Sequence, residues 1–362
     1  MTSVSEESRD RLLGPSPRAR WLLPVFLVVL VGLTLWRLGG APSGGDLHEF
    51  VGPTMGTTYS VKIVDSELTS EREQRIARAI ETRLARVNEL MSTWDPASEL
   101  SRFNRFASTR PFPVAPETLE VFRVAREVSD LTGGAFDVTV GPLVIAWGFG
   151  STARVPAEPP AAELGVLRER VGYRQVEIDE SGSLSKRHPE TECDLSAIAK
   201  GYGVDEVARA LVELGQHDFL VEVGGELRAM GERGPDRPWR VAIERPEAAA
   251  RSPFGVVELK NTSMASSGDY RNYFEQDGVR LSHLIDPRTG RPIAHALASV
   301  TVVHADAVRA DALATGLSVL GPEAGLALAE ENGLAAYFIV RERGGALRGV
   351  PTSAFPPVER VD

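Results

Sequence analysis

An aspartate, a lysine and the expected start of a helix lie close together in the segment Asp194-Leu-Ser-Ala-Ile-Ala-Lys200. Apolar residues follow at helical spacing as far as Leu214, and Gly215 supplies a stop, which predicts a helix with Asp194 at its mouth and Lys200 in its first turns. Free N–H groups at such a terminus attract phosphate, the lysine is a second phosphate partner, and the carboxylate suits a sugar hydroxyl, a base edge or a metal. Taken alone, the segment is better read as an ordinary capped helix with a solvated lysine.

A second pair of oxygen-bearing side chains stands far along the chain. Residues 305–320 read as a helix that ends at Gly321, with Pro322 beyond it, and Asp311 and Thr315 share one face of that helix. Among small alanines they leave room for a hard cation such as magnesium, whose other ligands come from water, backbone or phosphate. The structural alternative is a threonine bonded to its own helix and a solvated aspartate. Together the two segments indicate magnesium and a phosphorylated ligand.

Further segments combine turn residues with residues that could contact a ligand. Met55-Gly56-Thr57 precedes an alternating strand, Trp94 follows an amphipathic helix, and Gly133-Gly-Ala-Phe-Asp137 follows another. Each also has a purely structural interpretation, since the glycines can cap a helix and Trp94 can belong to the core. Residues 221–228 alternate like two strands joined at Gly224-Gly225, which predicts a hairpin whose glycines would also let a flavin or a pyrophosphate approach the backbone.

Taken in order, these segments resemble those of the ApbE family, the FAD:protein FMN transferases. The resemblance covers about residues 50–336, and eight motifs in the family's order are hard to obtain by chance. The motifs are Met55-Gly56-Thr57, Met91-Ser-Thr-Trp94-Asp95, Gly133-Gly-Ala-Phe-Asp137, Asp194-Leu-Ser-Ala-Ile-Ala-Lys200-Gly-Tyr202, Val223-Gly-Gly-Glu226, Ala265-Ser-Ser-Gly-Asp269-Tyr270, Ser282-His283-Leu-Ile285-Asp286-Pro-Arg-Thr-Gly290 and Ala310-Asp311-Ala-Leu-Ala-Thr315.

The resemblance implies an α+β fold in which mixed or antiparallel sheets and packed helices form two lobes with a flavin cleft between them. It implies metal ligands at the backbone of Ala197 and the side chains of Asp311 and Thr315, and a general base at His283. An equally good role for His283 is to orient the turn 286–290. Most relatives carry tyrosine where Trp94 stands, so stacking is retained but a phenol hydrogen bond is not. The resemblance implies FAD contacts at Met55, Trp94, Ala135, Phe136, Asp137, Asp194, Lys200 and Ile285.

The implied chemistry is attack on the pyrophosphate of FAD. A threonine or serine hydroxyl of another protein would form an FMN phosphoester while magnesium neutralises charge and AMP leaves. A histidine, whose pKa usually lies near neutrality, suits removal of the hydroxyl proton. The alternatives are a magnesium-dependent FAD pyrophosphatase, in which water replaces the acceptor, and a flavin-binding protein without turnover. Lys200, His283, Asp311 and Thr315 argue against the last of these.

The N-terminal segment predicts where the enzyme works. Residues 21–38 are nearly all apolar and long enough to cross a bilayer; four arginines precede them, whereas Arg37 stands alone at their C-terminal end. The positive-inside rule places residues 1–20 in the cytoplasm and the catalytic domain in the periplasm or outside the cell. Residues 39–48 fit a flexible tether or a signal-peptidase region, and we expect an anchor in the inner membrane. No cysteine follows for lipidation, and the only cysteine, Cys193, is expected to be a small packed residue.

Composition limits the partners and the fold. The formal net charge of −10 and the lack of a basic run after the membrane segment argue against nucleic acid, so we expect FAD and an acceptor protein of a membrane redox complex. No G-x-G-x-x-G fingerprint follows the first strand, which argues against a Rossmann sheet. The catalytic domain is expected over residues 49–343, with a surface loop at 151–160 and a Gly- and Pro-rich tail at 344–362 that adds little to the core.

Overall fold

The computed structural model describes residues 45–149, 157–179, 181–247, 252–269, 273–276 and 279–361. Gly45–Asp362 form one compact unit, so the two expected lobes belong to a single domain. The predicted cytoplasmic segment 1–20, the predicted membrane span 21–38 and most of the predicted tether 39–48 lie outside the described residues. So does most of the predicted loop 151–160.

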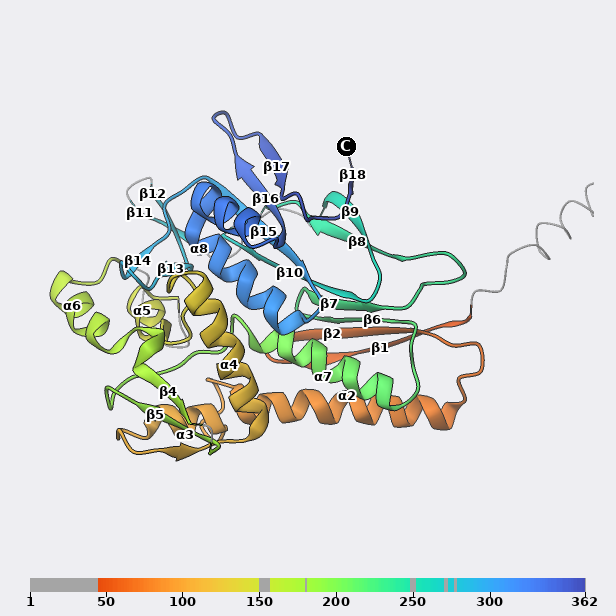
Figure 1. Cartoon of the computed structure of the whole chain (residues 1–362), viewed down its shortest axis with the longest axis horizontal. Coiled ribbons are helices and arrows are strands. Elements are labelled where there is room, and N and C mark those ends of the chain that lie inside the picture. The colour runs from red at the N-terminus through yellow and green to blue at the C-terminus, as the bar shows by residue number, and fades with distance from the viewer. Residues whose placement is uncertain are drawn as a thin grey trace, which may run out of the picture. The chain divides into compact units, whose positions relative to one another are not determined.

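An eight-stranded antiparallel sheet occupies the centre of this unit (Figure 1). Its order is β1-β2-β6-β7-β10-β15-β16-β17, and every neighbouring pair is antiparallel. The strands are β1 (Leu47–Thr54), β2 (Thr57–Val64), β6 (Phe219–Val223), β7 (Glu226–Met230), β10 (Thr262–Gly268), β15 (Leu297–His304), β16 (Ala335–Arg341) and β17 (Leu347–Pro351). The pairing of β2 with β6 brings the first ligand motif beside the Gly-Gly hairpin, although about 160 residues separate them in sequence.

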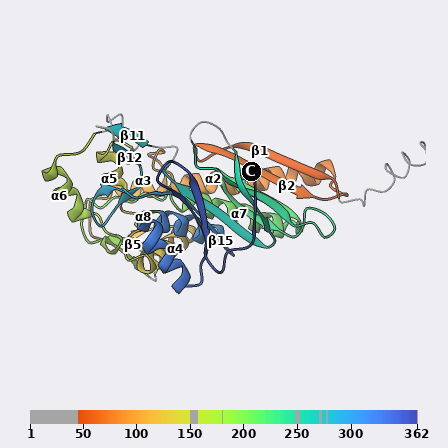
Figure 2. The ribbon, with the colours of Figure 1, turned by 90° about the horizontal axis from the view of Figure 1, so that it is seen from above.

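Helices cover one face of the sheet (Figures 1 and 2). They are α2 (Ser70–Met91), α7 (Ala199–Glu213) and α8 (Ala307–Glu331), and α4 (Pro116–Leu131) packs against α8. Apolar residues at helical spacing direct each helix inward, as Ile76, Ile80 and Leu84 of α2 do against β2 and β6. This spacing was readable from the sequence, and the predicted helices α2, α4 and α7 are confirmed.

Two consecutive residues of β10 show how the sheet separates two cores. Ala265 packs among the helices, whereas Met264 packs with Trp239 and Val257 on the other side. Neighbouring residues of a strand point to opposite faces, so the strands that carry Trp239 and Val257 cover the face that the helices leave. The sheet is therefore buried on both sides at this position.

Smaller elements complete the domain. One three-stranded sheet contains β8 (Trp239–Glu244), β9 (Pro253–Leu259) and β18 (Val358–Arg360), and another contains β3 (Phe112–Pro113), β4 (Val176–Asp179) and β5 (Ser183–Lys186). The pairs are β11 (Tyr273–Gln276) with β12 (Val279–Ser282) and β13 (Ile285–Asp286) with β14 (Arg291–Pro292). The short helices are α3 (Glu99–Arg105), α5 (Gly141–Ala146), α6 (Ala161–Arg170) and the 3₁₀ turn η2 (Tyr173–Gln175).

The predicted α+β class is confirmed, and so is the hairpin, in which Gly224 and Gly225 join β6 to β7 with positive φ values. The predicted helix over 305–320 is α8, but it does not stop at Gly321. It kinks there, where φ is 83°, and Pro322 begins a second helical stretch that continues to Glu331. Proline lacks an N–H and is tolerated at the start of a helix, so the pair bends the helix instead of ending it.

Two expectations about the ends of the domain are wrong. The tail 344–362 was expected to add little to the core, yet it supplies β17, β18 and the buried Phe355. β1 begins at Leu47, inside the predicted tether. β18 pairs with β9, far earlier in the chain, which a local pattern does not reveal, whereas β1 and β17 pair with the strands next to them in sequence.

Among the described residues, α8 is the helix whose length and apolar composition would suffice to cross a membrane. Those properties alone are weak evidence, because core helices share them. α8 packs on β10 and β15, and it carries Asp311 and Thr315 toward the ligand motifs. Its apolar residues therefore serve the domain core.

Candidate active site

Three adjoining cavities lie between the segments that carry the motifs, and Ser196 lines all three. Their volumes are about 510, 480 and 90 Å³. Except for Asp311, which is buried just behind Lys200, every predicted site residue lines at least one of them. These lining residues are Met55, Trp94, Ala135, Phe136, Asp137, Asp194, Ala197, Lys200, His283, Ile285 and Thr315. Residues from opposite ends of the domain sequence thus meet around one group of adjoining cavities.

Trp94 and Met55 both line the second cavity. Met55 occupies the tight turn between β1 and β2, where its φ is 48° and that of Gly56 is 70°. Trp94 is 76% exposed and lines both larger cavities, so the alternative that it belongs to the core is wrong. Ser92, at the end of α2, accepts a hydrogen bond from the Trp94 amide at 3.1 Å and so fixes the start of this loop. An exposed indole beside a cavity is suited to stacking on a flat ring.

Lys200 is the cation of the second cavity and has two carboxylate neighbours. Its Nζ lies 2.5 Å from Glu226 Oε1 and 3.9 Å from Asp311 Oδ1. Burial alone would lower the pKa of Lys200, but Asp311 and Glu226 outweigh it and raise that pKa. Burial raises the pKa of Glu226, and its second oxygen, Oε2, is buried without a hydrogen-bond partner within the described structure. Lys200 is therefore a charged ammonium group held in place from the Gly-Gly hairpin.

Asp311 and Thr315 lie one turn apart on α8, as the sequence predicted. Asp311 is buried, and its Oδ2 accepts a hydrogen bond from the Gly201 amide at 3.0 Å. Thr315 lines the smallest cavity together with Ala197. Burial raises the pKa of Asp311, so a nearby cation stabilises the ionised form.

The donor set at this place fits a hard cation. It consists of one carboxylate, one hydroxyl and backbone oxygen, and the described residues contain no group of three or more His, Cys, Asp or Glu side chains placed to hold a metal. Magnesium is commonly held by one or two carboxylates, with substrate phosphate and water as its other ligands. Asp311, Thr315 and the Ala197 backbone are therefore suited to magnesium and poorly suited to zinc.

Asp137 follows the two glycines that end α4, where Gly133 and Gly134 have φ values of 59° and 81°. Asp137 is 6% exposed, and its Oδ1 accepts hydrogen bonds from the Thr139 amide at 2.7 Å and the Thr139 hydroxyl at 2.6 Å. Burial raises the pKa of Asp137 to about 6, and these hydrogen bonds oppose the rise. The group therefore changes protonation in a range where most carboxylates are already ionised.

Asp194 is positioned by a residue to which the sequence assigned no role. Asn104, on α3, donates from its amide to the Cys193 carbonyl and accepts from the Cys193 amide, both at 2.8 Å. Asp194 then accepts a bond from the Ser196 amide at 2.9 Å. α7 begins at Ala199, so Asp194 precedes the helix and does not stand at its mouth as predicted. Cys193 is 2% exposed and burial raises its pKa, which agrees with a packed thiol.

His283 lines the largest and the smallest cavity and is half-buried. Its ring contacts Phe149 edge-on, with centroids 6.4 Å apart. The following turn is held by Asp286, whose carbonyl accepts from the Gly290 amide at 2.8 Å and whose side chain accepts from the Arg288 amide at 2.9 Å. Backbone and carboxylate therefore stabilise the turn, while His283 lines two of the cavities.

Comparison with known proteins identifies relatives over almost the whole domain. The profile of the ApbE family matches residues 55–338. A Vibrio cholerae protein named FAD:protein FMN transferase is 45% identical over 332 residues, which is 92% of this chain and 98% of that protein. The protein of the same name from Haemophilus influenzae is 44% identical, covering 81% of this chain and 86% of its own length. The solved structure titled flavin transferase ApbE from Vibrio cholerae superposes with a TM-score of 0.79 at 43% identity and covers 86% of this chain and 98% of its own.

Proposed function

The chain belongs to the ApbE family, and from this premise we propose that it transfers FMN from FAD to a threonine or serine hydroxyl of an acceptor protein, releasing AMP. The observation that supports this most strongly is the group of adjoining cavities on which the family's FAD motifs converge. It offers an exposed indole for a flat ring, a charged lysine for phosphate and an imidazole for a proton. Its three parts also leave room for a large dinucleotide and an incoming hydroxyl group.

The reaction exchanges one phosphorus–oxygen bond for another. The acceptor oxygen bonds to the phosphorus on the FMN side, and the bond from that phosphorus to the bridging oxygen breaks, so AMP takes the electron pair. His283 receives the proton of the attacking hydroxyl at a ring nitrogen. Lys200, held by Glu226 at 2.5 Å, is available to bind the pyrophosphate. Trp94 orients FAD by stacking and shields the site from water.

We propose that Asp311, Thr315 and the Ala197 carbonyl hold a magnesium ion. When bound, magnesium supplies charge neutralisation of the pyrophosphate and favours departure of AMP. The support for this proposal is the buried carboxylate of Asp311, whose ionised form needs nearby positive charge, together with Thr315 one turn along α8, which lines the smallest cavity with Ala197. Replacing Asp311 with alanine should reduce transfer at least about a hundredfold while the protein stays folded, because the principal charged ligand is lost.

The test compares Asp311→Ala with wild type in chelator-treated buffer to which magnesium is returned. Wild type should regain activity with added magnesium, and the variant should not. Exposed Asp95, which caps its own loop by accepting from the Ala97 amide at 2.8 Å, provides a control carboxylate in the Asp95→Ala variant. Full activity of Asp311→Ala without added metal would contradict the metal assignment.

We propose that His283 acts as the general base. His283→Ala should lower the single-turnover rate of transfer by a factor on the order of a hundred or more, while changing FAD affinity little, because a base acts chiefly in the transition state. Rapid-quench measurement of transfer and fluorescence titration of FAD separate the two effects. An equal loss in both would make His283 a binding residue.

We further propose that residues 21–38 anchor the enzyme in the inner membrane with the catalytic domain in the periplasm or outside the cell. The support is the long apolar run and the arginines that precede it. The acceptor would then be a protein of a membrane redox complex in the same compartment. Alkaline phosphatase fused after Gly45 should be active, and a reporter that folds only in the cytoplasm should be silent. The opposite pattern would refute this topology.

A further inference from the structure

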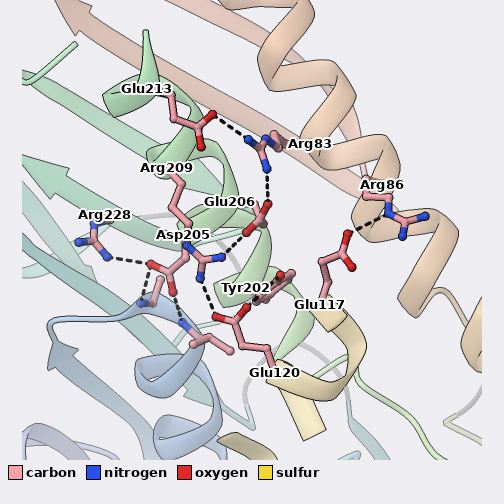
Figure 3. A network of polar contacts seen from close by, with 12 residues as sticks. Arg83, Arg86, Glu117, Glu120, Tyr202, Asp205, Glu206, Arg209, Glu213 and Arg228 are labelled. Carbon is pink, nitrogen blue, oxygen red and sulfur yellow. Dashed lines mark hydrogen bonds and ion pairs between the residues drawn. The ribbon is translucent and has the colours of Figure 1, made fainter. Parts of the chain in front are cut away.

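Asp205 joins the two helices that carry the phosphate-binding and metal-binding residues. It lies on α7, five residues after Lys200, and is 3% exposed. Its Oδ1 accepts a hydrogen bond from the Ala307 amide at 3.1 Å, and its Oδ2 accepts one from the Val308 amide at 2.9 Å (Figure 3). These amides belong to the first turn of α8, which has no side-chain cap of its own. A carboxylate from α7 therefore supplies the N-terminal cap of α8.

Arg228 ties the same junction to the sheet. From β7, its Nη1 donates to Asp205 Oδ1 (Figure 3) and to the Ala305 carbonyl, both at 2.9 Å. Burial of Asp205 is thus offset by two amides, the positive end of the α8 dipole and one guanidinium. The junction connects α7, α8 and β7 through hydrogen bonds, which are directional. It therefore restricts the position of the start of α8 more strongly than apolar packing would.

The metal-binding residues lie one turn away from this junction. Ala307 and Asp311 are four residues apart on α8, and Gly201 and Asp205 are four apart on α7. Asp205 bonds to Ala307, and Asp311 bonds back to the Gly201 amide at 3.0 Å. Two contacts one turn apart on each helix leave little freedom for α8 to slide or rotate along α7. Their common effect is to set the distance between Asp311 and Lys200, which is 3.9 Å from Nζ to Oδ1.

We propose that Asp205 is a positioning residue of the metal site. By capping α8 from α7, it sets the place of Asp311 and Thr315 relative to Lys200, so that one magnesium ion and one pyrophosphate are bound together. This inference rests on the proposed metal site. It assigns no contact between Asp205 and the substrate.

The neighbouring carboxylate provides a matched control. Glu206 is also buried, at 7% exposure, and also has arginine partners, accepting from Arg83 at 3.1 Å and from Arg209. Those partners join α7 to α2 and to its own surface, and neither belongs to α8 (Figure 3). Asp205→Asn and Glu206→Gln therefore remove the same charge from adjacent positions of one helix, but only the first changes the α7–α8 junction. An asparagine keeps the shape but turns one acceptor oxygen into a donor that faces the Val308 amide.

The experiment uses the full-length protein in detergent. Calorimetric titration with MgCl₂ measures metal affinity, fluorescence titration in chelator measures FAD affinity, and thermal melting measures stability. Asp205→Asn should weaken Mg²⁺ binding by about tenfold, the order expected when one charge-assisted bond is lost, and should change FAD affinity in chelator much less. Glu206→Gln should lower the melting temperature about as much as Asp205→Asn does, but it should leave Mg²⁺ affinity unchanged. A merely structural role for Asp205 would give both variants the same metal affinity.

The outcomes separate this inference from the proposal on which it rests. If wild type binds Mg²⁺ and Asp205→Asn binds it equally well, the positioning role is wrong and the metal site stands. If wild type binds no Mg²⁺, both are wrong. Should Asp205→Asn fail to fold, Arg228→Gln replaces it in the test. This variant removes the guanidinium that bonds Asp205 from β7, so it should also weaken Mg²⁺ binding. Unchanged Mg²⁺ affinity in that variant would likewise overturn the inference.

Discussion

Lys200 shows how one side chain serves both the fold and the proposed chemistry. Its ammonium group compensates the buried carboxylates of Glu226 and Asp311, whose side chains are 3% and 6% exposed. A buried charge without a partner is strongly destabilising. The same ammonium group lines the second cavity, where a pyrophosphate would share it.

Replacing Lys200 with alanine should therefore have two effects. FAD affinity should fall at least about tenfold, since one charge-assisted contact is lost, and the free energy of unfolding should fall by about 3 kcal/mol because two carboxylates lose their cation. Fluorescence titration and urea denaturation measure the two. Lys62→Ala is the control: Lys62 is 38% exposed and lies 3.7 Å from Glu49, so its loss should change stability by less than about 1 kcal/mol. An unchanged dissociation constant for FAD in Lys200→Ala would contradict the phosphate role.

Asp137 should make stability depend on pH in an unusual direction. Burial raises its pKa from 3.8 to about 6, so the folded state binds its proton more tightly than the unfolded state does. The contribution of Asp137 to the free energy of unfolding is fully present below pH 3.8 and is lost as pH rises through about 6. Asp137→Asn removes this pH dependence. The difference in free energy of unfolding between the variant and wild type should therefore shift by up to about 3 kcal/mol in favour of the variant as pH rises from 4 to 7. Denaturant unfolding of both proteins at both pH values measures this shift. If the difference in unfolding free energy between them is the same at both pH values, the raised pKa is contradicted.

At the residue scale, the sequence predicted which side chains gather but not what holds them. Asp311 and Thr315 were placed on one helix face because their spacing is local. The bond between Lys200 and Glu226 depends on how the hairpin packs against α7, and the bonds from Asn104 to Cys193 span 89 residues. Local periodicity carries no information on such pairs.

At the scale of elements, the close approach of α7 and α8 depends on Gly201. A methyl group at this position would lie 2.3 Å from the Ala307 carbonyl oxygen and 2.9 Å from Asp311 Cβ. Only glycine leaves room for the bond from its amide to Asp311. The helix contact and the proposed metal site therefore share one steric requirement.

Gly201→Ala should destabilise the domain by roughly 2 kcal/mol or more and weaken Mg²⁺ binding, because the helices must separate. Gly203→Ala, two residues along α7, is the matched control. Its methyl group would meet Leu84 and Met55 at an ordinary 3.5 Å, so the gain in helix propensity, up to about 1 kcal/mol, should offset any strain. Thermal melting and calorimetry distinguish the two variants. Equal stability would mean that the helices tolerate a wider separation.

Elements with strong helical periodicity were predictable, and short strands were not. α2, α4 and α7 each show one apolar stripe and occur where predicted. β18 pairs with the remote strand β9, whereas β1 and β17 pair with β2 and β16, their neighbours in sequence. A strand such as β18 depends on tertiary context, so the local pattern of the tail does not reveal it.

At the scale of the whole domain, the candidate site is assembled from distant elements that the antiparallel sheet brings together. Met55 enters from the turn between β1 and β2, Lys200 from α7 and Thr315 from α8, and these elements pack on one sheet. No single segment holds enough of the site to bind a dinucleotide. The family match over residues 55–338 agrees with a function that belongs to the whole fold.

The measurement that tests the central claim most directly follows both products of one reaction. Full-length protein is incubated with FAD and Mg²⁺, with and without a flavin-free acceptor subunit of a membrane redox complex. Intact-protein mass spectrometry detects FMN on the acceptor, and chromatography measures AMP. The account predicts equal amounts of AMP and FMN-bearing acceptor, with the flavin on a threonine or serine, and little AMP when the acceptor is omitted. AMP release at the same rate without the acceptor, and no gain in acceptor mass, would contradict flavin transfer and indicate FAD hydrolysis.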